Sequence, residues 1–226
     1  MSRPQPTSIY ADIEDVEDVL RKIELSYKIK FVTNEMAHLK TFGEISSYII
    51  AKIELKNIDD CTSQQTFYKL RSAIQSTGIS AEILPTTSLR SLFPYRNRRK
   101  QIAAVEKNIG FKINALRPKP VTVKIILSFF LFSIILIFFN WKYGLAGFAI
   151  SIILTKISDK TASHFCEETV GDLSKSIMYE NYIESRTDPK TINKQEILRN
   201  IEALFIRELG LSSEFSRLHD DTLIVD

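Results

Sequence analysis

Residues of the types that most often do chemistry are sparse in this sequence. Its three histidines are His38, His164 and His219. Only His164 has further metal-binding residue types close by, because Cys166 and Glu168 follow it within a few positions. A structural zinc site needs about four ligands that converge on one point, and no second group accompanies these. We therefore predict no metal site and interpret the cluster as the solvated start of a helix.

The acidic residues form no recognisable catalytic pair. Asp59–Asp60 and Asp220–Asp221 are pairs of a kind that more often cap helices or form turns than act as catalytic carboxylates. The two cysteines lie far apart and match no metal or redox spacing. The sequence contains no glycine-rich phosphate loop and no HExxH or GxSxG motif. We predict a protein without catalytic residues, cofactor or metal, and not an enzyme.

Positive charge gathers in one part of the chain, although the formal net charge is only +3. Residues 90–124 contain ten lysines and arginines and a single acid, Glu106. The run Arg96 to Lys100 admits three interpretations: a solvated helix face, a contact with anionic lipid headgroups, or nucleic-acid binding. Headgroups attract each such residue by about 1 kcal/mol, whereas nucleic-acid binding lacks an accompanying aromatic face. We expect no nucleic acid, and a membrane-surface basic patch of Arg96, Arg98, Arg99, Lys100, Arg117, Lys119 and Lys124.

Two uncharged apolar runs lie close together in the second half of the chain. Ile125–Phe139 and Tyr143–Leu154 are separated by Asn140, Trp141 and Lys142. Asparagine and lysine are costly in the middle of a membrane helix but are tolerated at the tip of a hairpin, where Trp141 suits the interface. Small residues on the second run would let two helices approach closely. The pattern predicts a transmembrane or membrane-inserted helical hairpin over residues 122–155.

Two other arrangements of these runs stay open. Each run is shorter than the roughly 20 residues that span a bilayer, so the hairpin could dip into one leaflet without crossing it. The hairpin could also form the core of a soluble domain. The runs are apolar on all sides, however, and the rest of the chain supplies too few apolar faces to cover them. This argument favours the membrane.

The charges beside the hairpin predict its sidedness. Basic residues flank both outer ends, whereas the tip carries only Lys142. Positive flanks stay in the cytoplasm, so both termini are expected there, with the hairpin in the cytoplasmic (inner) membrane. The polar, acidic N-terminal residues show no apolar core of a secretory signal, which agrees with this expectation. The outer flanking residues are Arg117, Lys119, Lys124, Lys156 and Lys160.

Helix start and stop signals recur in a similar order outside the hairpin. Thr41 and Glu44 are spaced as a capping box, and Thr169 with Asp172 repeats the spacing far downstream. An amphipathic pattern that starts at Gln64 follows the first cap, and a similar one that starts at Lys194 follows the second. Two amphipathic helices are expected to end near Gly78 and Gly210. The shared order of these segments predicts an internal repeat of helical units.

These segments resemble an acyl carrier protein, a small helical bundle. The run from Ala11 to Ile53 is similar to the second half of that family, whose last helix begins with a threonine cap like Thr41 to Ile49. The segment from Phe67 to Phe93 resembles the family's first helix and the loop after it. The C-terminal helix also resembles the family's first helix in its apolar positions, which are Ile197, Ile201, Leu204, Phe205, Leu209 and Leu211.

The resemblance implies a helical scaffold rather than the family's chemistry. The family attaches phosphopantetheine to the serine of an Asp-Ser-Leu motif. That serine position falls on Ile13 in the N-terminal unit and on or beside Tyr95 in the central unit. The second helix of the central unit is basic, from Arg96 to Lys100, where the family is acidic. No attachment serine is therefore available.

Together these patterns predict an all-α protein made of acyl-carrier-like bundles with an inserted hairpin. We expect a disordered segment at residues 1–10, one bundle from 11–56 with 194–226, and a central bundle from 62–121 with 160–182. The first bundle follows because each end of the chain would otherwise leave an apolar helix face uncovered. Pairing of the ends between two molecules, giving a homo-oligomer, is the competing outcome.

The function that fits this organisation is a membrane-anchored, non-enzymatic scaffold or adaptor. Its expected partners are the lipid bilayer with its anionic headgroups and a protein that the sequence does not identify. The alternative is a membrane-tethered, carrier-type accessory protein in acyl or lipid metabolism.

Overall fold

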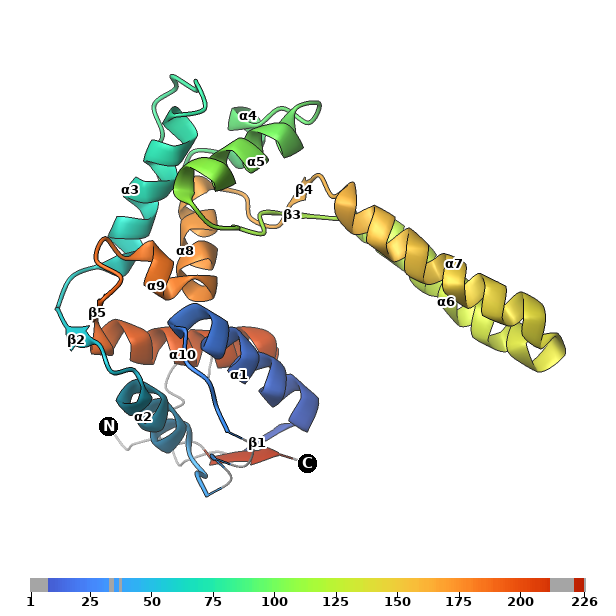
Figure 1. Ribbon diagram of the computed structural model, residues 1–226, viewed down its shortest axis with the longest axis horizontal. Coiled ribbons are helices and arrows are strands. Elements are labelled where there is room, and N and C mark those ends of the chain that lie inside the picture. The colour runs from blue at the N-terminus through green and yellow to red at the C-terminus, as the bar shows by residue number, and fades with distance from the viewer. Residues whose placement is uncertain (1–7, 33–34, 37, 212–221, 226) are drawn as a thin grey trace, which may run out of the picture. The chain divides into compact units, whose positions relative to one another are not determined.

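The computed structural model is mostly helical and describes residues 8–32, 35–36, 38–211 and 222–225 (Figure 1). The chain divides into two compact units. The first comprises Met1–Lys69 and Ser174–Asp226, and the second comprises Leu70–Leu173. Helices α3 (Thr62–Gln75) and α8 (Val170–Glu180) contribute residues to both units.

The helices of the first unit begin and end at residues with clear local reasons. They are α1 (Ile13–Tyr27), α2 (Phe42–Lys52), α9 (Tyr182–Ser185) and α10 (Lys194–Glu208). The capping box predicted at Thr41 is confirmed, because the Thr41 side chain accepts from the Glu44 amide and the Glu44 side chain accepts from the Thr41 amide. At α8 the Thr169 hydroxyl accepts from the Asp172 amide and donates to the Asp172 carboxylate.

The core of the first unit joins helices from the two ends of the chain. Both α1 and α2 pack against α10 (Figure 1). The rings of Phe42 and Phe205 meet edge to face with centroids 4.9 Å apart. Fully burying a side chain of this kind is worth about 1.5–3 kcal/mol. The apolar side chains buried at this junction include Val19, Ile23, Ile45, Ile49, Ile197, Ile201 and Leu204.

Among the described residues, three two-stranded pairs add a small β component to the helical fold. The pairs are β1 (Ser8–Ala11) with β6 (Thr222–Val225), β2 (Lys56–Asn57) with β5 (Thr191–Ile192), and β3 (Leu116–Arg117) with β4 (His164–Phe165). The first two are parallel and the third is antiparallel.

The pairing of β1 with β6 corrects the expectation of disorder over residues 1–10. Ser8 aligns with Thr222 and Ala11 with Val225, so this part of the segment is an ordered strand. Its backbone amides and carbonyls are satisfied by a partner at the other end of the chain, which no local pattern reveals. Residues 1–7 lie outside the described residues.

The second unit combines two short helical pieces with the predicted apolar segment. Its helices are α4 (Leu89–Leu92), α5 (Arg98–Ile109), α6 (Pro120–Phe139) and α7 (Trp141–Lys160). Helix α5 ends at Gly110, whose φ of +94° favours glycine. The buried apolar side chains of the second unit, apart from those in α6 and α7, include Leu70, Ile74, Ile83, Leu89, Phe93, Ile102, Val105, Ile113, Phe165 and Val170.

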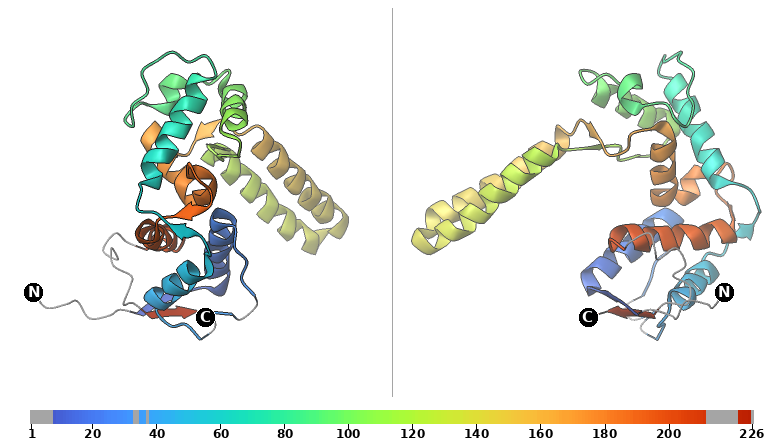
Figure 2. Two further views of the ribbon diagram at one scale, coloured as in Figure 1. Left: turned by 60° about the vertical axis from the view of Figure 1, so that its left-hand side comes forward. Right: turned by 180° about the vertical axis from the view of Figure 1, so that it is seen from behind.

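Helices α6 and α7 lie side by side along their length (Figures 1 and 2). The chain reverses at Asn140, the first of the three residues where a break was predicted. The Asn140 side chain accepts a hydrogen bond from the Lys142 amide and so caps α7. Trp141 and Lys142 are therefore the first residues of α7 rather than part of a turn. Both helices extend beyond the predicted arms, to Pro120 on one side and Lys160 on the other.

Candidate functional site

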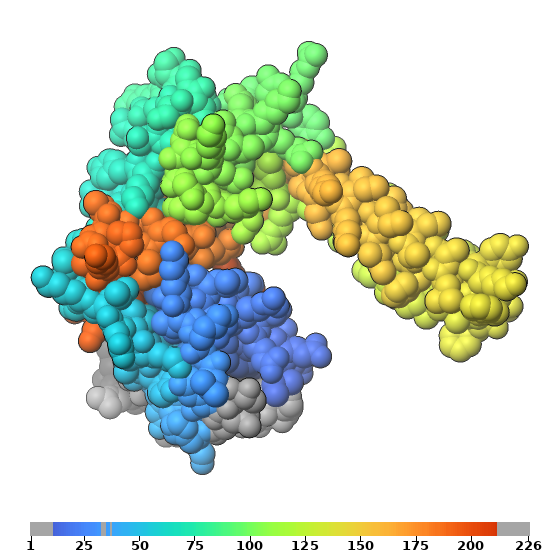
Figure 3. Space-filling view, viewed as in Figure 1, coloured from blue at the N-terminus to red at the C-terminus, as the bar shows by residue number. Residues whose placement is uncertain are grey.

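Small residues allow the close approach of α6 and α7. A Cβ atom at Gly144 would lie 2.6 Å from the backbone nitrogen of Ile137, and one at Gly147 would lie 2.5 Å from the Ser133 hydroxyl oxygen. Ser133 is buried in this contact and donates its own hydroxyl to the Phe129 carbonyl at 2.8 Å. The facing pairs show that the helices run antiparallel. Figure 3 shows the side chains of α7 packed along those of α6.

Large apolar side chains cover the outer surface of this helical pair. Phe138 is 87% exposed and Phe139 is 83% exposed. A contiguous apolar surface of this kind marks a site for a membrane or another apolar partner. Exposed members on α6 include Val123, Ile125, Leu127, Leu131, Phe132 and Ile135, and those on α7 include Trp141, Tyr143, Leu145, Ile150 and Ile153.

Only one of the two helices is long and apolar enough to cross a membrane. Within the described part of the chain, α6 alone meets this criterion, by length and composition. Helix α7 is as long, but it carries Lys142 in its first turn and Lys156, Asp159 and Lys160 towards its end. The finding supports one candidate membrane helix, and the prediction of a two-armed membrane hairpin goes beyond it.

A basic cleft lies at the open end of the helical pair. Its volume is about 590 Å³, and it is formed by the start of α5 and the residues that follow α7. Among the described residues, the side chains that line it include no acid. The lining residues are Ala103 and the polar Tyr95, Arg96, Arg99, Lys100, Thr161 and Ser163. We call this site the basic cleft.

The structure corrects the assignment of Arg98 to the membrane-surface patch. Arg98 is only 7% exposed, because its guanidinium is turned into the second unit. It donates to the Phe93 carbonyl at 3.0 Å and to the Ser163 carbonyl at 2.7 Å, and it lies 4.6 Å from the Phe165 ring centroid. Arg98 therefore holds the chain after α7 against the start of α5 and does not face lipid.

The other residues predicted for the patch are exposed but are only partly brought together. Arg96, Arg99 and Lys100 line the basic cleft. The Lys119 ammonium lies 5.4 Å from the Tyr95 ring centroid, which places it beside the cleft. The two remaining members, Arg117 in β3 and Lys124 in α6, are exposed and do not line the cleft.

Tyr95 lines the basic cleft, and its ring lies beside the ammonium of Lys119. A hydrogen bond from Ser163 and the positive charge of Lys119 lower the pKa of the Tyr95 phenol. Tyr95 is also one of the two residues at the predicted serine positions, and the other is Ile13. Ile13 is the exposed first residue of α1. The two positions therefore lie in different units.

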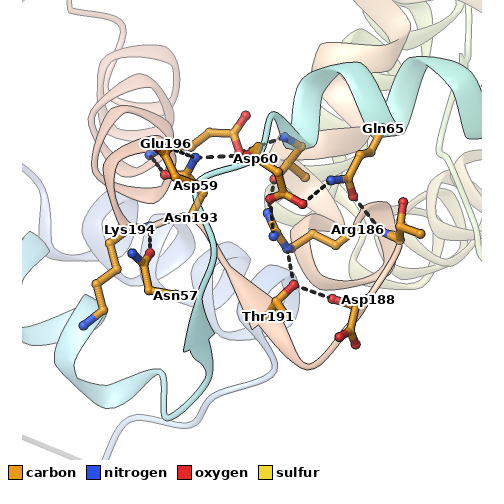
Figure 4. A network of polar contacts seen from close by, with 12 residues as sticks. Asn57, Asp59, Asp60, Gln65, Arg186, Asp188, Thr191, Asn193, Lys194 and Glu196 are labelled. Atoms are coloured by element: carbon orange, nitrogen blue, oxygen red, sulfur yellow. Dashed lines mark hydrogen bonds and ion pairs between the residues drawn. The ribbon is translucent and has the colours of Figure 1, made fainter.

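A second polar cluster, which sequence reasoning missed, surrounds Arg186 in the first unit (Figure 4). Arg186 is fully buried. Its guanidinium forms an ion pair with Asp60, donates to the Thr62 hydroxyl at 2.6 Å, and donates to the Thr191 hydroxyl at 3.1 Å. A buried charge of this kind is stable only when it is paired and hydrogen-bonded. We call these residues the Arg186 network.

The network continues through two groups that hold helix starts in place. Glu196 accepts from the backbone amides of Thr62 and Ser63 at 3.1 and 3.2 Å and so caps α3 from a distant part of the chain. Tyr182 donates to Glu196 at 3.3 Å, and burial raises the pKa of its phenol, which keeps the hydroxyl neutral. The Asn193 side chain caps α10 and donates to Asp59, which makes Asp59 part of a helix start.

Asp60 and Gln65 link the Arg186 network to the backbone near residue 187. Asp60 receives Arg186 on one oxygen and the Gln65 amide at 2.7 Å on the other, while Gln65 in turn accepts from the Thr187 amide at 2.6 Å. The arrangement fastens residues 57–66 to residues 182–196. The role that this geometry supports is structural, because it connects two segments of the first unit. No signal in the sequence pointed to Arg186.

The remaining residues with possible chemistry are the histidines, cysteines and acidic pairs. Among the described residues, no group of three or more histidine, cysteine, aspartate or glutamate side chains could hold a metal ion. His164 lies in β4, where it pairs with Arg117 in the antiparallel ladder. His219 and the Asp220–Asp221 pair lie outside the described residues. Comparison with protein-family models, curated proteins and solved structures finds no match to this chain.

Proposed function

We propose that this chain is a membrane-anchored, non-enzymatic scaffold or adaptor. The observation that carries the proposal is the outer surface of α6 and α7, where large apolar side chains are exposed along both helices. In water this surface would be unfavourable, since each such side chain contributes about 1.5–3 kcal/mol when it leaves water. A bilayer removes the penalty without requiring a partner protein of matching shape.

The proposed anchor is a hairpin that enters the bilayer from one side. Asn140, Trp141 and Lys142 form its tip, and basic residues flank its open end. Exposed flanking lysines and arginines suit a cytoplasmic headgroup layer. Both termini then lie on the same side of the cytoplasmic membrane, which allows α10 to pack against α1 and α2 within one molecule.

The scaffold role rests on how the first unit is built. Its core joins both ends of the chain, and the Arg186 network fixes the segments that connect its helices. Such a unit offers a defined surface for a protein partner. The acyl-carrier resemblance is part of this proposal only as a helical scaffold that binds other proteins.

Extraction of the full-length protein from membranes with alkaline carbonate tests the anchor. The protein should stay in the membrane fraction. Leu131→Arg, in the outer surface of α6, should increase release, because a charged residue at the centre of a membrane helix costs about 3 kcal/mol. Leu84→Arg is the matched control, since Leu84 is similarly exposed but lies outside α6 and α7. Full release of the unaltered protein would refute the proposal.

Labelling of single cysteines, in a chain whose exposed Cys61 and Cys166 are replaced by serine, tests the sidedness. Cysteines introduced at Ser2 and at Asp226 should react from the same side of the membrane, and one at Asn140 should be protected or react from the other side. Reaction of the two ends from opposite sides would leave only one membrane crossing.

Intact mass after co-expression with a phosphopantetheinyl transferase separates the scaffold from the carrier-type alternative, which requires a covalently added group.

A further inference from the structure

We propose that the basic cleft is a binding site for the phosphate group of an anionic phospholipid. The inference deepens the proposed function and rests on it for the source of the phosphate. Three cationic side chains, Arg96, Arg99 and Lys100, line one cleft of about 590 Å³. This volume lies within the range of about 300–1,000 Å³ that small-ligand sites occupy. Guanidinium groups bind phosphate through paired hydrogen bonds, and an ammonium adds a point charge.

In the part of the chain that the structure describes, no acidic side chain neutralises the three cations of the cleft. Among the described residues, Arg96, Arg99 and Lys100 form no ion pair of 4.0 Å or less. Like charges gathered in one cleft repel one another. A bound phosphate would relieve this repulsion and accept hydrogen bonds from the same side chains.

The start of α5 also lacks a negative partner. A helix N-terminus carries partial positive charge and unpaired amides, so acids are favoured in its first turn. The first turn of α5 instead contains Arg98, Arg99 and Lys100 and no acid, and the Asn97 side chain makes no capping hydrogen bond. A phosphate in the adjoining cleft would supply the negative charge that the sequence leaves out.

The position of the cleft identifies lipid as the source of the phosphate. Gly144 faces Ile137 and Gly147 faces Ser133, so the antiparallel register brings the start of α6 and the end of α7 to the same end of the pair. Thr161 and Ser163, which follow α7 directly, line the cleft. If the Asn140 end of the hairpin is inserted in the bilayer, the other end, with the basic cleft, lies at the level of the lipid headgroups.

The ring signal of Tyr95 provides a test on the full chain in neutral detergent. The protein is labelled at tyrosine for NMR, the Tyr95 signal is assigned with Tyr95→Phe, and short-chain phosphatidylglycerol is titrated in. The signal should shift and saturate. Arg99→Gln with Lys100→Gln should raise the half-saturating concentration about 30-fold, since each charge contributes about fivefold near an anionic headgroup.

A second double variant controls for net charge. Lys107→Gln with Lys112→Gln removes the same charge from exposed positions of the second unit that do not line the cleft. It should change the half-saturating concentration less than about twofold, because remote exposed charges are screened. An equal effect of both double variants would mean diffuse attraction and would overturn the site.

Further titrations separate the possible ligands. Short-chain phosphatidylcholine should shift the Tyr95 signal weakly, and equal binding of this zwitterionic lipid would overturn the proposal. Inorganic phosphate that saturates the shift as tightly as phosphatidylglycerol would keep the phosphate site but overturn lipid as its source. Tighter binding of a single-stranded oligonucleotide would assign the cleft to nucleic acid. Carbonate extraction reports separately on the anchor, so release of the protein together with saturable phosphate binding would refute the proposed function and retain the cleft.

Discussion

Removal of Asp60 should destabilise the first unit far more than removal of its neighbour Asp59. The two acids look equivalent in the sequence, but only Asp60 meets the guanidinium of Arg186. Arg186 is completely buried, so water cannot replace the lost carboxylate in Asp60→Ala. Leaving one charge of a buried pair uncompensated costs about 3–5 kcal/mol. The Asp60 side chain is itself 40% exposed, which places the expected cost at the lower end, about 3 kcal/mol.

Hydrogen exchange of the full-length protein measures this cost. Amides that exchange only when the first unit opens should exchange about 150-fold faster in Asp60→Ala, since each 1.4 kcal/mol is a factor of ten. Asp59 is exposed and accepts from the Asn193 side chain at 3.1 Å. Asp59→Ala therefore loses one ordinary hydrogen bond, worth about 1 kcal/mol. Exchange in α6 and α7 serves as the internal reference.

The combination with Arg186→Met tests the cause of the effect. Removing the guanidinium from Asp60→Ala also removes the uncompensated charge, so the double variant should be far more stable than the sum of the two single effects predicts. A coupling of about 2 kcal/mol is expected for residues in direct contact. Additive effects, or equal effects of Asp59→Ala and Asp60→Ala, would refute the assignment of the buried ion pair.

Three further predictions concern other contacts. Ile201→Asp places a carboxylate in the core that joins both ends of the chain, so hydrogen exchange in α1 and α2 should increase, and unchanged exchange would mean that the ends are independent. Gly144→Val should lengthen spin-label distances between α6 and α7, because its Cβ would meet the Ile137 backbone, whereas Val at the exposed Ala146 should not. Hydrogen bonds, the strongest of them from Lys52, lower the pKa of the Glu35 carboxyl from 4.5 to about 2. This carboxylate therefore stabilises the fold above pH 4.5 and loses that contribution as the pH falls towards 2. An NMR titration midpoint near 4.5 would contradict this geometry.

The sequence predicted the features that depend on neighbouring residues. The threonine and glutamate spacing at Thr41 predicted the cap of α2, because a capping box involves only residues three positions apart. Asn140 marked the reversal between α6 and α7, since a polar residue between two apolar runs favours a helix end. The helical character of the chain followed from the same local patterns.

Burial of individual charged residues was decided by the tertiary structure alone. The basic run near residue 96 has one chemical character in the sequence, yet Arg98 donates to the carbonyl of Ser163 inside the second unit while Arg99 lines the basic cleft. The two residues are neighbours in the sequence, but their environments differ. The segment that contains Ser163 follows α7 and packs beside the start of α5, where it covers Arg98. No local pattern specifies that contact.

The Arg186 network shows the same limit in the first unit. The ion pair between Arg186 and Asp60 joins residues 126 positions apart, and the core of α1, α2 and α10 joins segments still further separated. Local propensity and hydrophobic period report which face of a helix is apolar, and so they predicted that such faces would be covered. Which segment covers each face, and which polar side chains are buried beside it, depends on contacts that form only when distant parts of the chain meet.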